Sequence, residues 1–355
     1  MEKIDNMKSI ALISPRLSHG GSERFTINIS RGFSEKGYQV FLLTGPKEEQ
    51  EYLIPKGVHR IELLGASSFL NDIKAVYRYL KKNQIDFCLA VGIYPNLIAG
   101  AANVKLKTKI VLLERNAPKQ DRLSWKSRFL RKLLYRRGDA FVFQTPDAMK
   151  FYSGHIQRKG IVIGNPLKEG LPYRNNEPKK EIIAIGRLEK QKNYFVLLRA
   201  MKIIAEKSPE YCLRIFGEGP CRSEIVSMIK NLKLEKKVYL EGFCDNVHDR
   251  IKNSDIFVMS SDYEGLPNAL MEAMAMGFPV VSTDCPCGGP KMLIGNNENG
   301  ILVPVNNAKA LADAVIYLIQ FPAKKEQMGV KARESMTQYT LLNIINKWEI
   351  FLRDL

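Results

Sequence analysis

Short apolar runs alternate with helix-length amphipathic segments along almost the whole chain. The runs are rich in Ile, Val, Leu and Phe and are four to six residues long. Continuous apolar runs of this length are typical of strands in parallel sheets that are covered by helices on both faces. The predicted strands are residues 9–14, 39–43, 87–91, 109–113, 140–143, 181–185, 212–216, 237–240, 255–259 and 279–282. The pattern therefore predicts an α/β fold built from doubly wound parallel sheets.

The alternation is interrupted once, between residues 163 and 178. Pro, Gly and Asn cluster there, in Ile163-Gly-Asn-Pro-Leu and in Arg174-Asn-Asn-Glu-Pro. Such residues favour a linker over a packed element. We expect an N-terminal Rossmann-like domain over residues 1–164, a linker over 165–178, a C-terminal Rossmann-like domain over 179–336 and a final helix over 337–355. Because doubly wound sheets bind ligands at the carboxyl ends of their strands, the two domains are expected to face a shared central cleft.

The composition gives the N-terminal half a strong positive charge. The 355-residue chain is 45% hydrophobic and carries a net charge of +17, which excludes disordered, collagen-like and coiled-coil proteins. Residues 1–170 contain 29 Lys and Arg against 15 Asp and Glu, a net charge of +14. Such an excess indicates an anionic partner, which can be a nucleic acid, an anionic membrane surface or a substrate with a diphosphate.

Other compositional features favour a protein that works in the cytoplasm without crossing the bilayer. The six cysteines include no Cys-x-x-Cys pair, and no signal peptide precedes the first strand, so we expect free thiols in a reducing compartment. Residues 87–104 carry no charge, but Pro95 and Asn96 lie in their middle, so a strand, turn and helix are expected instead of a membrane span. Four scattered histidines leave little for a metal site, and none is predicted.

Glycines and cations occupy the turns where two predicted strands lead into helices. The first strand ends before Gly20-Gly21-Ser-Glu23, where paired glycines let backbone N–H groups approach an anion at a helix N-terminus. The first strand of the second domain is followed by Gly186-Arg187-Leu, and Lys192 lies five positions after Arg187. Arg187 and Lys192 can clamp a diphosphate, although a solvated basic loop would have the same composition.

The densest motif runs from Glu264 to Pro279. A predicted buried strand ends, Glu264-Gly265-Leu266-Pro follows, and a short Ala, Met and Leu helix contains Glu272. A lone carboxylate in a nearly apolar helix is costly unless a partner meets it, and the hydroxyls of a ribose are suitable partners. Glu264 can reach a ligand that lies across the helix N-terminus, where the N–H groups of Gly265 and Leu266 can hold a phosphate oxygen.

Taken together, these segments resemble a known enzyme family. The segments are Gly20-Gly21-Ser-Glu23, Gly186-Arg-Leu with Lys192-Asn193, Phe216-Gly-Glu-Gly219, Leu240-Glu-Gly-Phe243, Glu264-Gly-Leu-Pro and Glu272-Ala-Met-Ala-x-Gly-x-Pro. They are similar to those of the retaining nucleotide-sugar glycosyltransferases of family four, which have the two-domain GT-B fold. The similarity extends in particular to bacterial enzymes that add hexoses or hexosamines to polyprenyl-diphosphate-linked glycans or surface polysaccharides.

The resemblance implies a role for each matching residue. Arg187 and Lys192 would bind the donor diphosphate, Glu264 the hydroxyls of the donor sugar and Glu272 the ribose. Gly265 and Leu266 would contribute backbone donors, the loops at Gly217 to Gly219 and at Phe243 would flank the nucleobase, and Gly20 and Gly21 would close over the donor from the other domain. The resemblance also implies a UDP-sugar as donor and transfer without a metal or other cofactor.

The chain departs from the family at one expected catalytic position. Many members have a histidine near the anomeric carbon, after the fourth strand of the first domain, where this chain reads Leu113-Glu114-Arg115-Asn116. Arg115 or Asn116 would have to take its place, and Arg115 is the stronger candidate because it can contact the sugar or the phosphate. The alternative is a loop arginine in a salt bridge.

Residues 119–137 predict a basic helix with exposed aromatic residues. Apolar residues fill one half of it and include Trp125 and Phe129, with Asp121 as the one acidic residue. Arg128, Arg131 and Lys132 are expected on the opposite side. The basic residues are Lys119, Arg122, Lys126, Arg128, Arg131, Lys132, Arg136 and Arg137. Part of the apolar half must pack on its own sheet, and the rest is typical of a helix that docks on anionic lipid.

These features together predict a peripheral glycosyltransferase on the inner face of the cell membrane, with a polyprenyl-linked or other membrane glycolipid as acceptor. Soluble, teichoic-acid and protein acceptors are alternatives within the same fold. A catalytically silent partner subunit and a basic nucleic-acid-binding protein are alternatives of another class. The chain contains no recognised nucleic-acid module, so specific nucleic-acid binding is not expected.

Overall fold

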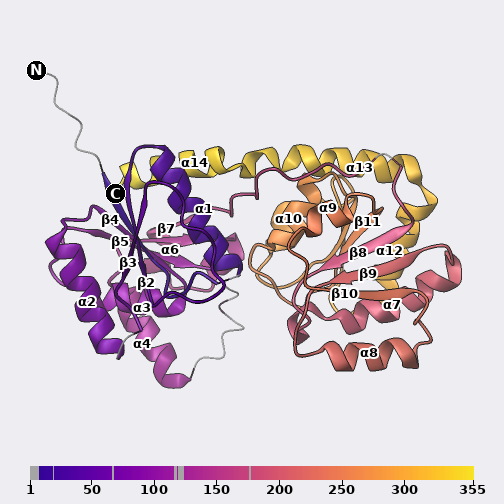
Figure 1. Ribbon diagram of the computed structural model, residues 1–355, viewed down its shortest axis with the longest axis horizontal. Coiled ribbons are helices and arrows are strands. Elements are labelled where there is room, and N and C mark those ends of the chain that lie inside the picture. Colours follow the sequence, from indigo (N-terminus) through magenta and orange to yellow (C-terminus); the bar gives the residue numbers. More distant parts are fainter. Residues whose placement is uncertain (1–7, 19, 66–67, 116–117, 119–123, 176) are drawn as a thin grey trace, which may run out of the picture. The chain divides into compact units, whose positions relative to one another are not determined.

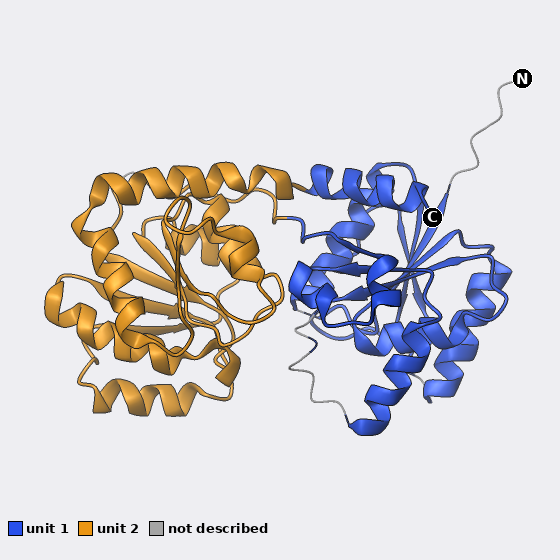
Figure 2. Ribbon diagram, turned by 180° about the vertical axis from the view of Figure 1, so that it is seen from behind, with its two compact units in different colours: residues 1–166, 341–355 blue, residues 167–340 orange. Residues whose placement is uncertain are grey.

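The computed structural model describes residues 8–355 except 19, 66–67, 116–117, 119–123 and 176. The chain divides into two compact units, of which unit 1 comprises Met1–Pro166 with Leu341–Leu355 and unit 2 comprises Leu167–Thr340 (Figure 2). No helix within the described ranges is both long and apolar enough to span a membrane.

The described residues of unit 1 form a seven-stranded parallel sheet in the order β3-β2-β1-β4-β5-β6-β7. The strands are β1 (Ser9–Ile13), β2 (Gln39–Thr44), β3 (Val58–Glu62), β4 (Phe87–Val91), β5 (Lys109–Glu114), β6 (Ala140–Phe143) and β7 (Gly160–Val162). Strand order reverses beside β1, which pairs with β2 on one side and β4 on the other. This arrangement confirms the predicted doubly wound sheet, with β1 and β4 fully buried at its centre.

Helices cover both faces of the unit 1 sheet (Figure 1). The helices are α1 (Gly21–Glu35), α2 (Phe69–Lys82), α3 (Ile93–Ala102), α4 (Trp125–Tyr135), α5 (Pro146–Lys150), α6 (Gly154–Arg158) and α14 (Leu341–Arg353). Helices α2, α3 and α4 pack side by side on one face, and α14 packs against α1 on the other. The uncharged stretch 87–104 forms β4, a turn at Gly92 and α3, as predicted.

The described residues of unit 2 form a six-stranded parallel sheet in the order β10-β9-β8-β11-β12-β13. The strands are β8 (Glu181–Ile185), β9 (Cys212–Phe216), β10 (Val238–Gly242), β11 (Ile256–Met259), β12 (Val280–Thr283) and β13 (Ile301–Val303). The α-helices are α7 (Tyr194–Lys207), α8 (Arg222–Asn231), α9 (Val247–Ile251), α10 (Asn268–Ala275), α11 (Gly289–Leu293), α12 (Ala308–Gln320) and α13 (Pro322–Ser335), and Lys190–Lys192 and Thr337–Tyr339 form 3-10 helices. Helix α12 packs on α7, and α10 packs on α13.

Three strands escaped prediction, and all three lie at sheet edges. They are β3, β7 and β13. β3 contains His59, Arg60 and Glu62, and β7 and β13 are only three residues long, so none of them offers an apolar run of four or more residues. Residues of β3 and β7 are half-buried or exposed except for Val58. The predicted strands all coincide with observed ones to within two residues at either end.

The segment that follows the unit boundary is held to unit 2 by a buried charge cluster. Asp255 is 2% exposed at the start of β11, where the Lys325 ammonium lies 2.7 Å from Oδ2 and the Tyr211 hydroxyl donates to the same oxygen at 2.6 Å. Arg174, which precedes β8, approaches Oδ1 of Asp255 at 3.6 Å and binds Glu326 on α13. A buried carboxylate with several donors tolerates burial, and the cluster anchors this segment beside the sheet.

Helix α14 lies far from the rest of unit 1 in sequence but forms part of its core. Trp348 is fully buried and meets Phe33 of α1 edge to face, with 6.4 Å between ring centroids. A Cβ atom on Gly32 would lie 2.4 Å from Cγ1 of Ile345, so this glycine permits the close approach of α1 and α14. Lys36 pairs with Glu349 at 3.0 Å at the edge of the contact.

Replacement of Trp348 with Ala tests this packing. The substitution is expected to lower the free energy of unfolding by about 3–5 kcal/mol, because it removes a large buried ring and leaves a cavity. Ile350→Ala, on the same helix at a side chain that is 61% exposed, should cost no more than about 0.5 kcal/mol. Denaturant titration of both variants provides the comparison, and equal losses would contradict the packing described for α14.

Candidate functional site

The loops that follow β8, β9 and β10 are tied together at the carboxyl edge of the unit 2 sheet. The N–H of Gly186 donates to Phe216 O at 3.0 Å, and the N–H of Gly217 donates to Gly242 O at 2.8 Å. The N–H of Leu188 donates to Glu218 O at 2.9 Å. Because parallel strands end at the same edge, segments that are distant in sequence meet here, which is where doubly wound sheets bind ligands.

Lys192 and Glu264, which are 72 positions apart, form an ion pair at this edge. The ammonium lies 2.5 Å from Oε1 of the carboxylate, which also accepts a hydrogen bond from the Ser261 hydroxyl at 2.7 Å. The Lys192 side chain is 21% exposed and that of Glu264 is 9% exposed. An ammonium has three donors, so this contact leaves Lys192 able to bind a second anion.

The loop that carries Lys192 is held by Asn193. This residue has a left-handed backbone, with φ 44°, and its side chain caps α7 by accepting from the Val196 N–H at 3.3 Å. Its amide nitrogen donates to Asp262 in the loop after β11 at 2.7 Å. The Ser260 hydroxyl donates to Lys192 O at 2.8 Å. Asn193 therefore caps the N-terminus of α7 and also connects the Lys192 loop to the loop after β11.

Two of the predicted glycines are required by close backbone packing. A Cβ atom on Gly217 would lie 2.0 Å from Gly186 O, and one on Gly219 would lie 2.6 Å from Leu188 O. Neither neighbouring atom belongs to a flexible side chain, so a larger residue would push the loops after β8 and β9 apart. The same holds at Gly289, where a Cβ atom would lie 1.7 Å from the carbonyl oxygen of Gly265.

The turn after β12 supports the Glu264 loop. The Glu264 N–H donates to Pro286 O at 3.3 Å, and the Thr283 hydroxyl donates to Ser261 O at 2.6 Å. Burial, together with the nearby Glu264 carboxylate, raises the pKa of the Cys285 thiol to about 12. The thiol therefore stays protonated at neutral pH and is a packing group, not a nucleophile.

Glu272 meets a partner that the sequence did not reveal. It lies on α10 among buried apolar residues, and its Oε2 is 2.8 Å from Nε2 of His248 on α9. Nδ1 of the same imidazole is 3.4 Å from the Lys168 ammonium. His248 is 24 positions from Glu272 on a separate short helix, and no motif connects them, so the sequence does not predict this contact.

Two predicted donor-site residues project into solvent. The Arg187 side chain is 75% exposed and pairs with Glu189 at 3.1 Å, a surface ion pair of the kind that contributes little stability. Phe243, in the loop after β10, is 65% exposed. Neither takes part in the Lys192–Glu264 pair, and their predicted roles toward a donor stay predictions.

In unit 1, the predicted glycine pair lies where β1 leads into α1. Gly20 is the N-cap residue, with extended backbone and no side-chain hydrogen bond to the helix, and Gly21 is the first helical residue. A Cβ atom on Gly20 would lie 2.2 Å from Oε2 of Glu23. The Glu23 carboxylate therefore lies beside Gly20 at the N-terminus of α1, and the anion-binding role of the glycine pair stays a prediction. His19 lies outside the described residues.

Arg115 is buried at the end of β5, in contrast to a residue that projects toward a ligand. Its side chain binds Oδ1 of Asn165, and its guanidinium lies 3.6 Å from the centroid of the Phe25 ring on α1. Burial lowers the pKa of this guanidinium, and the Glu114 carboxylate opposes the shift. Gln144 also donates to Asn165 at 2.9 Å. The contacts of Arg115 thus join strand ends within unit 1, and its role toward the sugar stays a prediction. The other candidate, Asn116, lies outside the described residues.

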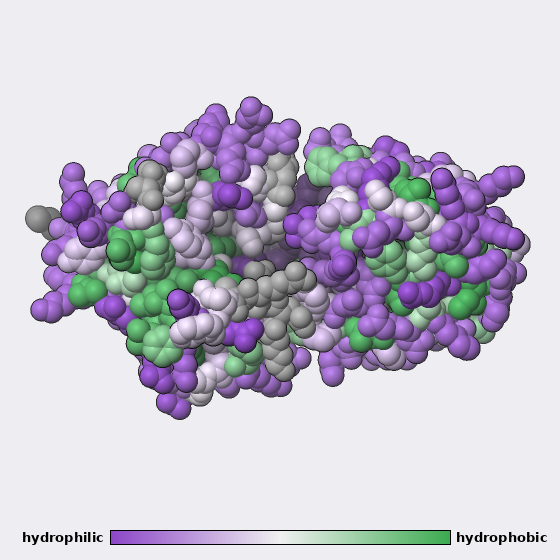
Figure 3. All heavy atoms as spheres, turned by 90° about the horizontal axis from the view of Figure 1, so that it is seen from below, coloured by the Kyte–Doolittle hydropathy of each residue, from purple (hydrophilic) through white to green (hydrophobic). Residues whose placement is uncertain are grey.

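Helix α4 exposes aromatic and basic side chains together. Trp125, Phe129 and Leu133 recur at every fourth position and are 75%, 66% and 52% exposed. Five cations of the predicted set are exposed around them, Lys126, Arg128 and Lys132 on the helix and Arg136 and Arg137 just beyond its end. Figure 3 views the side on which α4 lies in Figure 1 and shows apolar and hydrophilic groups intermingled on unit 1. Lys119 and Arg122 lie outside the described residues.

Arg131 corrects one expectation for this helix. It is 7% exposed, and its guanidinium lies 5.5 Å and 5.8 Å from the ring centroids of Phe151 and Tyr152. The Tyr152 hydroxyl in turn donates to Glu114. The side of α4 that packs on the rest of unit 1 therefore contains a cation close to two aromatic rings, while Trp125, Phe129 and Leu133 are exposed.

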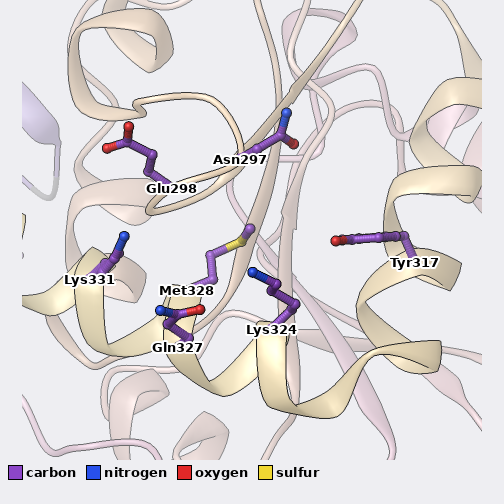
Figure 4. A pocket seen from close by; sticks show the side chains of 7 residues that line it. All are labelled: Asn297, Glu298, Tyr317, Lys324, Gln327, Met328 and Lys331. Atoms are coloured by element: carbon purple, nitrogen blue, oxygen red, sulfur yellow. The ribbon is translucent and has the colours of Figure 1, made fainter.

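A surface pocket of unit 2 lies at the opposite edge of the sheet. Figure 4 shows its lining, which consists of Asn297, Glu298, Tyr317, Lys324, Gln327, Met328 and Lys331. These residues come from the loop before β13 and from the adjoining ends of α12 and α13. Because that loop leads into the amino end of β13, the pocket is separate from the loops around Lys192 and Glu264.

Comparison with known proteins identifies the family. The model for "Glycosyltransferase Family 4" matches residues 19–167, and the model for "Glycosyl transferases group 1" matches residues 172–335. An uncharacterized glycosyltransferase of Haemophilus influenzae is 26% identical over 342 residues, which cover 94% of this chain and 96% of that protein. The N-acetylgalactosamine-N,N'-diacetylbacillosaminyl-diphospho-undecaprenol 4-alpha-N-acetylgalactosaminyltransferase of Campylobacter jejuni is 29% identical over 356 residues, which cover 92% and 94%.

The fold comparison agrees. The structure of Anabaena Alr3699/HepE in complex with UDP matches with a TM-score of 0.84 at 18% identity, covering 98% of this chain and 100% of that chain. The family models together extend from the glycine loop of unit 1 to the end of α13 in unit 2. The chain belongs to the glycosyltransferases of GT-B type, with a family 4 region in unit 1 and a group 1 region in unit 2.

Proposed function

We propose that the protein transfers a hexose or N-acetylhexosamine from a UDP-sugar to a polyprenyl-diphosphate-linked saccharide, with retention of configuration. The observation that carries the proposal is the Lys192–Glu264 pair at the carboxyl edge of the unit 2 sheet. It combines a cation with spare donors and a carboxylate that can accept from hydroxyls, as the diphosphate and the sugar of a donor require.

The chemistry follows from these two groups. Transfer breaks the bond between the anomeric carbon and the diphosphate, forms a bond to an acceptor oxygen and leaves negative charge on UDP. Lys192 stabilises that charge, and Glu264 accepts hydrogen bonds from the sugar hydroxyls and holds the anomeric carbon in place. Arg187, held only by a surface ion pair, can turn to the diphosphate. The residues alone supply this stabilisation, so we propose a reaction that needs no metal.

Relatives support the choice of donor and acceptor. UDP is the bound nucleotide of the Anabaena structure, and the Campylobacter relative is named for transfer to a diphospho-undecaprenol-linked saccharide with an alpha linkage. Sugars are usually α-linked in UDP-sugars, so an alpha product corresponds to retention. Both proteins match almost the whole of this chain.

We propose that α4 holds the enzyme at an anionic membrane surface on the cytoplasmic side. Its exposed aromatic stripe is bordered by cations, and no acidic side chain lies between Trp125 and Tyr135. Aromatic side chains bury in the lipid interface while Lys and Arg bind anionic headgroups. A polyprenyl-linked acceptor is confined to the membrane, so a surface of this kind would bring the site to its substrate.

The test of the function is a donor and acceptor assay. Purified protein is incubated with UDP-GlcNAc, UDP-GalNAc, UDP-Glc, UDP-Gal or a GDP-sugar, with membrane-extracted polyprenyl glycolipid and a metal chelator, and nucleotide release is measured. We expect one UDP-sugar to give lipid-dependent release that the chelator leaves intact. Failure of every nucleotide sugar to give lipid-dependent release would overturn the proposal, and loss of activity with chelator would overturn its metal-independent part.

Lys192→Met should lower the rate of transfer by about a hundredfold or more, because it removes a cation that stabilises the leaving diphosphate. The matched control is Lys190→Met, which removes an exposed lysine from the same 3-10 helix and should keep transfer near the wild-type rate. Circular dichroism verifies that both variants fold. Equal activity of the folded Lys192→Met and Lys190→Met proteins would exclude the assigned role.

Membrane docking is tested by sedimentation with lipid vesicles. Wild-type protein should bind vesicles that contain anionic lipid and should bind less as salt increases, because the cations of α4 are screened. Trp125→Ala combined with Phe129→Ala should weaken binding, while Leu342→Ala, at another exposed apolar residue of unit 1, should not. Undiminished binding of the double variant would place the docking surface elsewhere.

A further inference from the structure

A histidine that no motif revealed lies against the carboxylate expected to hold the ribose. His248 is 7% exposed, contacts Glu272 through Nε2 at 2.8 Å and contacts Lys168 through Nδ1 at 3.4 Å. We propose that His248 is a positioning residue that orients Glu272 for the ribose of the donor nucleotide. The inference rests on the proposed function, because it assumes that a nucleotide binds at this edge of the sheet.

The surroundings of Glu272 explain why such a residue is needed. Glu272 is 7% exposed, and Leu270, Met271, Ala273 and Met274 beside it on α10 are all buried. A carboxylate in such a helix is strongly destabilised unless a donor meets it. A flexible partner would stabilise the charge without fixing its direction. The imidazole is a rigid ring on a short stem, so its hydrogen bond also restrains the plane of the carboxylate.

Lys168 determines which way the imidazole hydrogen bond runs. An ammonium group is only a donor, so Nδ1 of His248 must be the acceptor in its contact with Lys168. The ring proton of the neutral imidazole then resides on Nε2, where it donates to Glu272. A proton on Nδ1 would point at the ammonium and be repelled. The three residues thus form a chain with a single direction, from Lys168 to His248 to Glu272.

The chain joins three segments of unit 2. Lys168 belongs to the segment that begins at Leu167, His248 belongs to α9, and Glu272 belongs to α10. Helix α9 follows the loop that contains Phe243, the residue predicted beside the nucleobase. Orientation of Glu272 by His248 would therefore tie the element after the base loop to the element that holds the ribose.

Calorimetric titration with two nucleotides separates this role from a purely structural one. The ligands are UDP and 2′,3′-dideoxy-UDP, which lacks both ribose hydroxyls. His248→Leu should weaken UDP binding about tenfold, as expected for loss of a hydrogen bond to a charged group. Binding of the dideoxy nucleotide should not change, because Glu272 has no hydroxyl to bind. His248→Gln, whose amide nitrogen can replace Nε2, should restore UDP binding.

Two further variants complete the design. Asp249→Asn, at an exposed neighbour on α9, is the matched control and should bind UDP as the wild type does. Lys168→Met removes the group that directs the ring proton and should also weaken binding of UDP selectively. Thermal denaturation of each variant without ligand verifies that it folds.

The outcomes distinguish the inference from the function on which it rests. Wild-type protein that binds no UDP would overturn the proposed function. Wild-type protein that binds UDP, with His248→Leu unchanged or weakened equally toward both nucleotides, would overturn the positioning role alone. Failure of His248→Gln to restore binding, despite a native fold, would also contradict a role through the Nε2 hydrogen bond.

Discussion

The contact between Lys192 and Glu264 is the interaction on which the site depends. Each residue follows a different strand, and the parallel sheet brings the ends of β8 and β11 next to each other. Each charge of the pair compensates the other, because an unpaired charge in this partly buried place would be costly. The surrounding contacts, from Asn193 to Asp262 and from Ser260 to the Lys192 carbonyl, hold the two loops at the separation that the pair requires.

The central part of the fold could be predicted from the sequence because central parallel strands are buried on both faces. Their apolar runs are long enough to stand out, whereas β3 contains charged residues and β7 and β13 are only three residues long. The residues of the Glu264 motif could be found because glycine, proline and a lone carboxylate recur there in a pattern that chance seldom gives. Gly217 and Gly219 were singled out by resemblance, and the structure adds a packing reason for each.

The remaining features depend on contacts between distant segments, which no local pattern encodes. Arg131 occupies a helix position that periodicity assigns to the polar side, yet the rings of Phe151 and Tyr152 offer a cation a buried place. Arg115 likewise lies in a loop sequence that suits a ligand, but Asn165 and Phe25 take up its guanidinium. His248 reaches Glu272 only because α9 and α10 both lie at one edge of the sheet.

The two glutamates of the motif illustrate how different partners suit different tasks. Glu264 is compensated by an ammonium on a long flexible side chain, which can shift toward a phosphate while Ser261 continues to donate to the carboxylate. Glu272 is compensated by an imidazole that is itself held by Lys168, and a ring in this position has little freedom to move. Under the proposed function, Glu264 shares Lys192 with a diphosphate whose charge changes during transfer, whereas Glu272 binds a ribose that does not react. In that proposal, the two glutamates, which are eight positions apart, divide the donor between a part that changes during transfer and a part that does not.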